Sequence, residues 1–261
     1  MSRLDHLAHP FCRAFYERRW PGPDTPNLDG LSLTEAYEVQ ALVADQRIAR
    51  GERVVGYKVG CTSSAIRKQF GLSEPIYGRL FAPHTTHETS PIDWTQYANC
   101  AIEPEMVLTI GKDLAGEALS RDELIDGIQH VSPGIELHHY TFWQQPPTTQ
   151  ELICSGGIHA GLVIGDTHVS GRSLSYRDET FSVSMDGEMV TSAPASEIMG
   201  GPLYALRWLV SALTRKGECL SAGSLVIPGS PVELITIDCD TLLNVSIEHI
   251  GQVEVLFKEQ T

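Results

Sequence analysis

The chain has few basic residues, and they form no run. Lys and Arg together number 19, against 33 Asp and Glu, which gives a formal net charge of −14 at neutral pH. Nucleic acids and anionic membrane surfaces bind proteins through clusters of Lys and Arg. The composition therefore predicts no nucleic acid and no membrane as a partner.

Long apolar runs and paired cysteines are also absent from the sequence. No uninterrupted apolar stretch approaches the roughly 20 residues of a membrane-spanning helix. The opening residues, Met-Ser-Arg-Leu-Asp-His-Leu, do not have the apolar segment of a secretory signal. The six cysteines include no Cys-x-x-Cys pair, which favours reduced thiols over a disulfide framework. We therefore expect a cytoplasmic protein.

The N-terminal third of the chain has helical patterns. Ser32-Leu-Thr-Glu35 is a capping box that predicts a helix to about Arg50, ended by Gly51. Residues 54–60 are typical of a strand, and a short helix is expected from Ser64 to Phe70. The stretch from Pro21 to Asn27 contains three prolines and predicts a linker or surface loop.

From about Asn99 onward, short β-rich runs dominate and are separated by Gly, Asp and Pro. The expected strands are Met106–Ile110, Ile135–Leu137, Gly161–Ile164, Phe181–Met185, Ser224–Ile227, Leu242–Ile247 and Val253–Phe257. Two helices interrupt them, one from the capping box at Ser120 to about His130 and one from Pro202 to Lys216. The pattern predicts an α+β fold. Residues 1–75 would form a mostly helical lobe that includes the strand of Lys58, and residues 76–261 a mixed β body.

Three glutamates lie in short apolar stretches that predict strands. Glu103 and Glu105 are two residues apart, so in a strand they share one face, with Pro104 on the other. Like charges on one face repel unless a cation lies between them, and Mg²⁺ and Mn²⁺ prefer oxygen ligands. A third carboxylate, Glu136, lies in another such stretch. The pattern predicts a divalent-metal site, and the alternative is a solvated strand face.

Lys58 lies in the strand 54–60, between Gly56 and Gly60. It is either a solvated charge at a strand edge or a buried functional ammonium. Glycines on both sides allow a ligand to approach the backbone closely. A desolvated lysine has a lowered pKa and can act as an acid and a base near neutral pH.

The segment Gly51-Glu-Arg-Val-Val-Gly-Tyr-Lys-Val-Gly-Cys-Thr-Ser63 resembles the signature of the 2-keto-4-pentenoate hydratase / 4-oxalocrotonate decarboxylase family, within the fumarylacetoacetate hydrolase superfamily. The likeness extends over about residues 30–257. It also includes Leu33–Gln40, Pro75 with Gly78–Phe81, Glu103-x-Glu105 leading to Asp113-Leu114, Gly134-Ile-Glu136, and Gly161–Gly165.

This resemblance implies a rolled, mixed β-sheet core with a small helical N-terminal lobe. It implies Mg²⁺ or Mn²⁺ held by Glu103, Glu105 and Glu136, with Lys58 as an acid–base or carboxylate-binding group. It further implies a small 2-oxo acid or 2-hydroxydienoate from aromatic ring-cleavage pathways as the substrate. The protein would be a homo-oligomer, or part of a complex with another enzyme of its pathway.

The sequence departs from the family pattern where the substrate would lie. Ile76 and Tyr77 stand where the family often has an acidic residue, which weakens a hydratase assignment. An Asp-Ser-Arg-like stretch is replaced by Leu137-His-His-Tyr-Thr-Phe-Trp143, whose Phe142 and Trp143 either line a pocket or pack in the core. Ser155–Ala160 replaces an Asp-Asn-Ala-Ser-like segment. These changes predict an altered substrate or reaction.

The replaced segments bring in three histidines, each either a general base or a hydrogen-bonded core residue. We predict His159 as catalytic, because Gly156 and Gly157 leave space beside it, and His138 as substrate-binding; the role of His139 stays open.

Two further residues are predicted to bind the substrate. Arg79 is expected to bind a distal carboxylate, or else to lie in a surface turn. Ser230, in Pro228-Gly-Ser-Pro231, resembles a family loop near the substrate carboxylate, although a plain turn explains it nearly as well.

The sequence thus predicts a metal-dependent lyase, a decarboxylase or hydratase of 2-oxo acids. A 2-oxo acid offers two oxygens that chelate one cation, which then acts as a Lewis acid. Two alternatives remain open. One is a hydrolase or tautomerase acting on an acylpyruvate-type substrate, and the other is a non-catalytic partner subunit of an active homologue. Retention of the three carboxylates and of Lys58 argues against the second.

Overall fold

The computed structural model describes residues 2–19, 27–87, 90–140 and 147–260. Its α-helices are α1 (Arg3–Glu17), α2 (Leu33–Ala49), α3 (Ser64–Gln69), α4 (Arg121–Gly127), α5 (Thr149–Cys154) and α6 (Pro202–Thr214). Its strands are β1 (Val54–Gly60), β2 (Ile76–Phe81), β3 (Thr85–Thr86), β4 (Cys100–Ile110), β5 (Ile128–His139), β6 (His159–Ile164), β7 (Val169–Ser170), β8 (Thr180–Met185), β9 (Glu188–Pro194), β10 (Leu225–Ile227), β11 (Ile235–Thr236), β12 (Thr241–Ile247) and β13 (Gly251–Phe257). Most of the predicted 21–27 loop, together with Phe142 and Trp143, lies outside the described residues.

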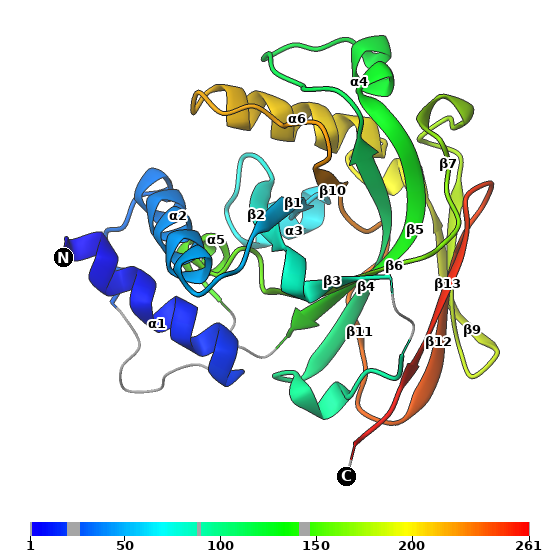
Figure 1. Cartoon of the computed structure of the whole chain (residues 1–261), viewed down its shortest axis with the longest axis horizontal. Helices are drawn as coiled ribbons and strands as arrows, with labels where there is room; N and C mark the ends of the chain where they lie inside the picture. The colour runs from blue at the N-terminus through cyan, green and yellow to red at the C-terminus, as the bar shows by residue number, and fades with distance from the viewer. Residues whose placement is uncertain (1, 20–26, 88–89, 141–146, 261) are drawn as a thin grey trace.

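The strands form two sheets. The larger has the order β2-β1-β10-β4-β5-β6-β3, with β11 also paired to β4 and β7 to β5. It is mixed, because β1 pairs with β10 and β3 with β6 in parallel, whereas its other pairs are antiparallel. The smaller sheet has the order β13-β12-β8-β9 and is antiparallel. Figure 1 shows the long strands β4 and β5 curving through the middle of the molecule.

Apart from α3, which lies near β1 and β10 in the middle of Figure 1, the α-helices gather in two groups around the larger sheet. In Figure 1, α1, α2 and α5 lie together on one side, α6 and α4 lie above, and the smaller sheet lies on the opposite side. Apolar residues of α1, α2 and α5 form one shared core, to which Ile76 of β2 contributes. A larger core joins α6 to residues of β4 such as Met106 and Leu108.

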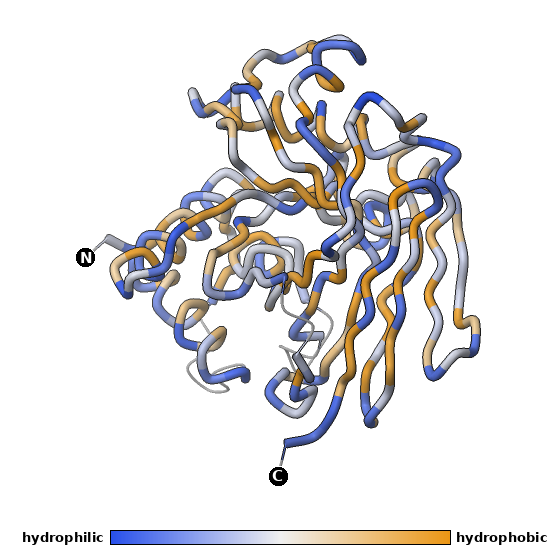
Figure 2. Tube along the Cα trace, turned by 45° about the vertical axis from the view of Figure 1, so that its right-hand side comes forward, coloured by the Kyte–Doolittle hydropathy of each residue, from blue (hydrophilic) through white to orange (hydrophobic). Residues whose placement is uncertain are grey.

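Alternating residues of β4 serve different sides of the curled sheet. Ile102 packs in the core between the two sheets, and Met106 packs in the core that α6 covers. Residues 103, 105 and 107 take the opposite, inner face. That face is closed by a small apolar floor of Leu80, Val107, Leu162, Ile164 and Ile227. Figure 2 shows these central strands mainly in the hydrophobic colour and the hairpin tips in the hydrophilic one.

The predicted α+β fold, a rolled mixed sheet with N-terminal helices, is confirmed. Several sequence-based boundaries were wrong. The strand predicted from Met106 begins at Cys100, and the helix predicted to reach Lys216 ends at Thr214. The helix predicted to reach about His130 ends at Gly127, because Ile128 already pairs with Ile110 and begins β5. That strand was predicted only at Ile135–Leu137, yet it runs over 12 residues. The sequence patterns gave no bounds for α1, β2, α5 or β9.

The predicted boundary between the two lobes, at residue 75, separates elements that pack together. Strand β1, assigned to the N-terminal lobe, lies inside the larger sheet between β2 and β10. Helix α5, assigned to the body, packs with α1 and α2 in the N-terminal core. The two-part division therefore stays a prediction. Among the described residues, no helix is long and apolar enough to cross a membrane.

Candidate metal and catalytic site

The three predicted carboxylates come from the two longest strands. Glu103 of β4 stands directly opposite Glu136 of β5 in the antiparallel register, and Glu105 stands opposite Gly134. Directly opposed residues, and residues two apart on one strand, share a face, so all three side chains lie on the inner face of the curled sheet. The side chain of Glu103 is 22% exposed, whereas Glu105 and Glu136 are fully buried. We call these three residues the carboxylate cluster.

Lys58 reaches this cluster from β1. Its cross-strand neighbours are Gly78 and Ile227, and the second of these belongs to the apolar floor. The ammonium Nζ lies 2.7 Å from Oε1 of Glu136 and donates a hydrogen bond of 3.3 Å to the carbonyl oxygen of Gly157. With 3% of its surface exposed, Lys58 is the buried ammonium and not the solvated edge charge.

Glycines bring the chain close to Lys58. A Cβ at Gly78 would lie 2.2 Å from the carbonyl oxygen of Gly156, so only glycine lets that loop lie against β2. Gly157 has a φ of +75°, and a Cβ there would lie 3.4 Å from Cε of Lys58. The predicted role of Gly56 was wrong. Its space is filled by the neighbouring strand, since a Cβ there would lie 1.9 Å from the carbonyl oxygen of Leu225.

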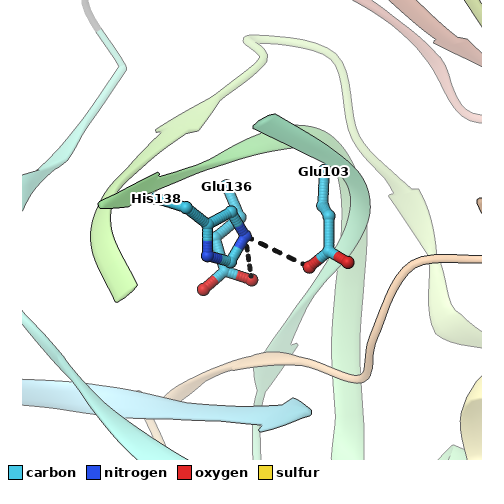
Figure 3. A group of neighbouring side chains, drawn as sticks. All are labelled: Glu103, Glu136 and His138. Carbon is cyan, nitrogen blue, oxygen red and sulfur yellow. Dashed lines mark hydrogen bonds and ion pairs between the residues drawn. The ribbon is translucent and has the colours of Figure 1, made fainter. Parts of the chain in front are cut away.

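Two of the three histidines touch the cluster. His159 Nδ1 lies 2.8 Å from Oε1 of Glu136, the oxygen that also receives Lys58. His138 Nε2 lies 3.1 Å from Oε2 of Glu103 and 3.5 Å from Oε2 of Glu136. Figure 3 shows the His138 ring directed at both carboxylates. Oε1 of Glu136 thus contacts both Lys58 and His159, whereas Oε2 faces His138.

A β-bulge and a small residue make room for these rings. The pairing of β5 with β6 shifts between Leu137 and His138, so that Ala160 is the extra residue and His159 faces the inner side with Glu136. Across β4, His138 stands opposite Ala101, whose methyl group leaves space for an imidazole.

His139 lies away from the cluster. Its Nδ1 accepts a hydrogen bond from the backbone N–H of Ala98, and its ring contacts Phe15 and Tyr97. Burial, together with the charge of Arg18, lowers the pKa of His139 to about 3, so its imidazole is neutral at ordinary pH.

The charged groups of the site shift one another's pKa values. Burial together with repulsion from Glu136 and Glu103 raises the pKa of Glu105 well above its usual value. Burial acts the same way on Glu136, but Lys58 and the neighbouring histidines outweigh it and hold its pKa far below the usual value. Burial opposes the charge of Lys58, yet attraction to Glu136 leaves its pKa raised. The sequence suggested a lowered pKa for Lys58, whereas the structure gives a raised pKa. Burial lowers the pKa of His159 to about 4.

Ser230 lies in the loop after β10, beside the cluster. The preceding residue, Gly229, donates its backbone N–H to Oε2 of Glu105 at 3.1 Å. Gly229 has a φ of +113°, and a Cβ there would lie 2.6 Å from the Thr62 side chain. The Ser230 hydroxyl itself bonds within its turn, to the carbonyl oxygen and N–H of Val232.

Arg79 is not brought to the cluster. It stands opposite Tyr57 in the β1–β2 pair, so it takes the sheet face opposite Lys58. Its Nη1 donates to Oε1 of Gln40 in α2 at 3.0 Å. Gln40 in turn donates to the carbonyl oxygens of Tyr77 and Ile153, so Arg79 belongs to the contact between the sheet and the helices.

Potential metal-ligand atoms of Glu103, Glu136 and His138 all lie within 4.8 Å of one another. From the sequence, His138 was predicted to bind substrate and not metal. Its place beside the carboxylates could have been predicted, because Glu136 and His138 are two residues apart on a strand, the same spacing as Glu103 and Glu105. The contacts made by Gly78, Gly157 and Gly229 carried no such signal, since they depend on loops far away in the sequence.

Comparison with known proteins agrees with this architecture. The family described as Fumarylacetoacetate (FAA) hydrolase C-terminal matches residues 67–257, and the chain belongs to this family. It is 28% identical over 258 residues to a 2-keto-4-pentenoate hydratase of Paraburkholderia phymatum, covering 99% of this chain and 98% of that one. It is 29% identical over 235 residues to a 4-oxalocrotonate decarboxylase of a Pseudomonas species, covering 89% and 91% of the two chains.

A solved structure has the same fold over nearly the whole chain. The 4-oxalocrotonate decarboxylase from Pseudomonas putida G7, complexed with magnesium and adipate, superposes with a TM-score of 0.92 at 22% identity, covering 98% of each chain. The curled sheet and the N-terminal helices of this chain are thus shared with that structure.

Proposed function

We propose that this protein is a divalent-metal-dependent lyase that decarboxylates or hydrates a small 2-oxo acid or its 2-hydroxydienoate form. The observation that carries the proposal is the convergence of Glu103, Glu105 and Glu136 on the inner face of the sheet, with the buried ammonium of Lys58 against them. Relatives named as a hydratase and as a decarboxylase support the reaction class.

The donor set fits Mg²⁺ or Mn²⁺. Oε1 of Glu105 and Oε2 of Glu136 are buried and have no hydrogen-bond partner within the part of the chain that the structure describes. An unpartnered buried carboxylate oxygen is costly, and a cation removes that cost. Glu103, Glu105 and Glu136 would hold the metal, and hard oxygen ligands suit either ion.

When bound, the metal would supply Lewis acidity toward the carbonyl of a 2-oxo acid. Three carboxylates outweigh a 2+ charge, so the Lys58 ammonium is needed to let an anionic substrate approach. Lys58 would also hold and deliver a proton at Nζ. His159 would orient Glu136 through Nδ1. Its buried Nε2, which has no hydrogen-bond partner among the residues that the structure describes, would accept a proton.

An apolar side chain at residue 76, near Lys58, favours decarboxylation over hydration. Ile76 pairs with Gly60 in the β1–β2 register and so shares the sheet face of Lys58. It is 2% exposed and brings no acid to that face. Hydration needs an activated water and a delivered proton, whereas loss of CO₂ needs the product carbanion to be stabilised and protonated.

Two substrates test the proposal and separate the reactions. The purified protein, with Mg²⁺ or Mn²⁺, would be incubated with 4-oxalocrotonate and with 2-keto-4-pentenoate, and the products followed by NMR. We expect release of CO₂ from the first compound, lost on metal removal with EDTA and restored by adding metal back. No turnover of either compound in any metal form would contradict the proposal.

The contact of His159 with Glu136 specifically favours one alternative, a C–C hydrolase or tautomerase of an acylpyruvate-type substrate. A buried histidine beside the carboxylates, with a ring nitrogen that contacts no polar group of the described residues, would be placed to activate a water molecule. The same NMR assay with an acylpyruvate would reveal this activity as two cleaved acids, or as an enol without cleavage.

Two residues beside the cluster are also proposed to lie near the substrate. Ser230 would contact the substrate carboxylate, because the Gly229–Ser230 loop adjoins the cluster. His138, which lies against Glu103 and Glu136, would approach the substrate only at the metal. We do not extend the proposal to Arg79, which lies on the other sheet face. A cytoplasmic location and a homo-oligomeric assembly remain proposals, to be checked by fractionation and by native mass spectrometry, which would also reveal a partner enzyme.

A further inference from the structure

We infer that His138 is itself a metal ligand, so that the centre has a mixed oxygen and nitrogen donor set and prefers Mn²⁺ to Mg²⁺. This inference rests on the proposed function, since it concerns the same metal. Its basis is the position of Nε2 of His138, which lies against one oxygen of Glu103 and one of Glu136.

The spacing of the three donor atoms fits one ion. Ligand atoms about 2.1 Å from an octahedral ion lie about 3 Å apart when they are adjacent. The distances from Nε2 to Oε2 of Glu103 and of Glu136 are 3.1 and 3.5 Å, and the three atoms lie within 4.8 Å of one another. The rings and carboxylates therefore need little movement to share an ion.

His138 is buried, and its described polar contacts are all made by Nε2. His138 is 1% exposed, so water does not reach the imidazole from bulk solvent. Its Nδ1 is buried and has no hydrogen-bond partner among the described residues, so Nε2 carries all of its described polar contacts. The opposing residue, Ala101, leaves the ring space at this position.

A neutral fourth ligand also suits the charge of the site. Three carboxylates and a divalent ion sum to −1, which the Lys58 ammonium balances. A fourth carboxylate would repel an anionic substrate, whereas an imidazole adds a donor without charge. Glu103, Glu136 and His138 have donor atoms within 4.8 Å of one another. With Glu105 as a fourth donor, two of six octahedral positions would remain, the number that the paired oxygens of a 2-oxo acid require.

The ligand type sets the metal preference. Imidazole is a common ligand of Zn²⁺, Cu²⁺, Fe²⁺ and Ni²⁺, whereas Mg²⁺ and Mn²⁺ both favour oxygen donors and Mg²⁺ also keeps several waters. Mn²⁺ accepts both kinds of donor. We therefore expect tighter binding of Mn²⁺ than of Mg²⁺, and we expect the difference to depend on His138.

The test is electron spin-echo envelope modulation of the Mn²⁺-loaded protein, which detects a nitrogen bonded directly to manganese. We expect strong ¹⁴N modulation in the wild type, converted to a ¹⁵N pattern when histidine is labelled with ¹⁵N. The modulation should be lost in His138→Gln and kept in His159→Gln and His139→Gln. Titration calorimetry should show the Mn²⁺ over Mg²⁺ preference falling by about tenfold or more in His138→Gln.

The outcomes are distinguishable. Tight Mn²⁺ binding without directly bonded nitrogen would overturn the inference and leave the proposed function intact. Nitrogen modulation that persists in His138→Gln but disappears in His159→Gln would assign the ligand to His159 and also overturn it. No Mn²⁺ binding at all would contradict the proposed function. The histidine-labelling result requires no substitution, so it holds even if a variant fails to fold.

Discussion

At the scale of single residues, the site depends on how the two oxygens of Glu136 are used. Oε1 receives Lys58 and His159, and Oε2 is left toward His138 and Glu103. This division lets one carboxylate hold the ammonium in place and still offer an oxygen to a cation. Substitutions of Lys58 and of His138 should therefore have different effects, because the two side chains contact different oxygens of Glu136.

Replacing Glu136 by glutamine should abolish both metal binding and activity. The amide keeps the shape but removes the charge, so Mn²⁺ affinity is expected to fall by more than about 100-fold, with kcat/KM falling in parallel. Calorimetric titration with Mn²⁺ measures the first effect. Glu254→Gln, an exposed substitution on β13, is the matched control. Unchanged Mn²⁺ affinity in Glu136→Gln would contradict the ligand assignment.

Replacing Lys58 by methionine should separate metal binding from substrate binding. Removing a positive charge beside a divalent ion leaves Mn²⁺ affinity unchanged or up to about tenfold tighter. Proton transfer and balance of the substrate charge are lost, so kcat should fall by about 10²–10⁴-fold. Oxalate affinity of the Mn²⁺ form should also fall. Loss of Mn²⁺ binding in this variant, or retention of full activity, would show that Lys58 has another role.

At the scale of elements, close backbone approaches shape the site. Strand β2 can carry the Gly156–Gly157 loop only because residue 78 has no side chain. The loop places the Gly157 carbonyl on Lys58, and the bulge in β6 turns His159 inward. A ligand site built on two long strands is thus completed by irregular segments.

Gly78→Ala should displace that loop. The added Cβ would lie 2.2 Å from the Gly156 carbonyl oxygen, so the loop must move away and Lys58 loses its hydrogen bond to Gly157. We expect kcat to fall by at least about tenfold, with Mn²⁺ affinity retained, because the carboxylates lie on β4 and β5. Gly60→Ala is the control, since its Cβ would lie 3.4 Å from Ile76 Cγ1 and can be accommodated. Equal activity in both variants would mean that the loop does not position Lys58.

The elements also show what sequence patterns can and cannot predict. Alternation in β4 placed Glu103 and Glu105 on one face, and capping boxes predicted the starts of α2 and α4 correctly. The end of α4 could not be predicted, because Ile128 pairs with Ile110 of β4 and so begins β5. The sheet face of Arg79 could not be predicted either, because the register of β2 against β1 determines it.

At the scale of the whole molecule, a buried polar network joins the N-terminal helices to the sheet. Glu52 lies between Arg47 of α2, at 2.7 Å, and Tyr16 of α1, at 2.6 Å, and it also contacts His84 at 3.2 Å. The Arg47 guanidinium lies over the rings of Phe15 and Phe81. The sheet that carries the cluster and the helices that cover it are therefore linked by charge as well as by packing.

Replacing Glu52 by glutamine should destabilise the protein without affecting Mn²⁺ binding. The change leaves the buried Arg47 guanidinium without its ion pair, which costs about 3–5 kcal/mol in unfolding free energy. Chemical denaturation at pH 7.5 measures the loss. Calorimetric Mn²⁺ titration of the folded variant is the control. A stability equal to that of the wild type would show that the ion pair is dispensable.

The same network predicts acid sensitivity. Burial raises the pKa of Glu52, but the Tyr16 hydrogen bond and the Arg47 charge outweigh it and lower the pKa. Burial also lowers the pKa of His84. Both pKa values are depressed on folding, so the stability they contribute is present above their unfolded values and is lost as pH falls. The loss begins below about 6.5 for His84 and below about 4.5 for Glu52.

Thermal melts between pH 4 and pH 8 follow this effect. The melting temperature of the wild type should fall on acidification, and the gap between wild type and Glu52→Gln should narrow toward pH 4. A gap that widens as the pH falls would contradict the assigned direction of the Glu52 shift.

The most direct test of the metal site is a crystal structure of the protein soaked with Mn²⁺ and oxalate, whose paired oxygens imitate those of a 2-oxo acid. The account predicts one strong anomalous peak in contact with Glu103 and Glu136, with both oxalate oxygens on the ion and Lys58 within hydrogen-bonding reach. A manganese peak elsewhere in the molecule, with the two glutamates still bonded only to Lys58 and the histidines, would contradict it.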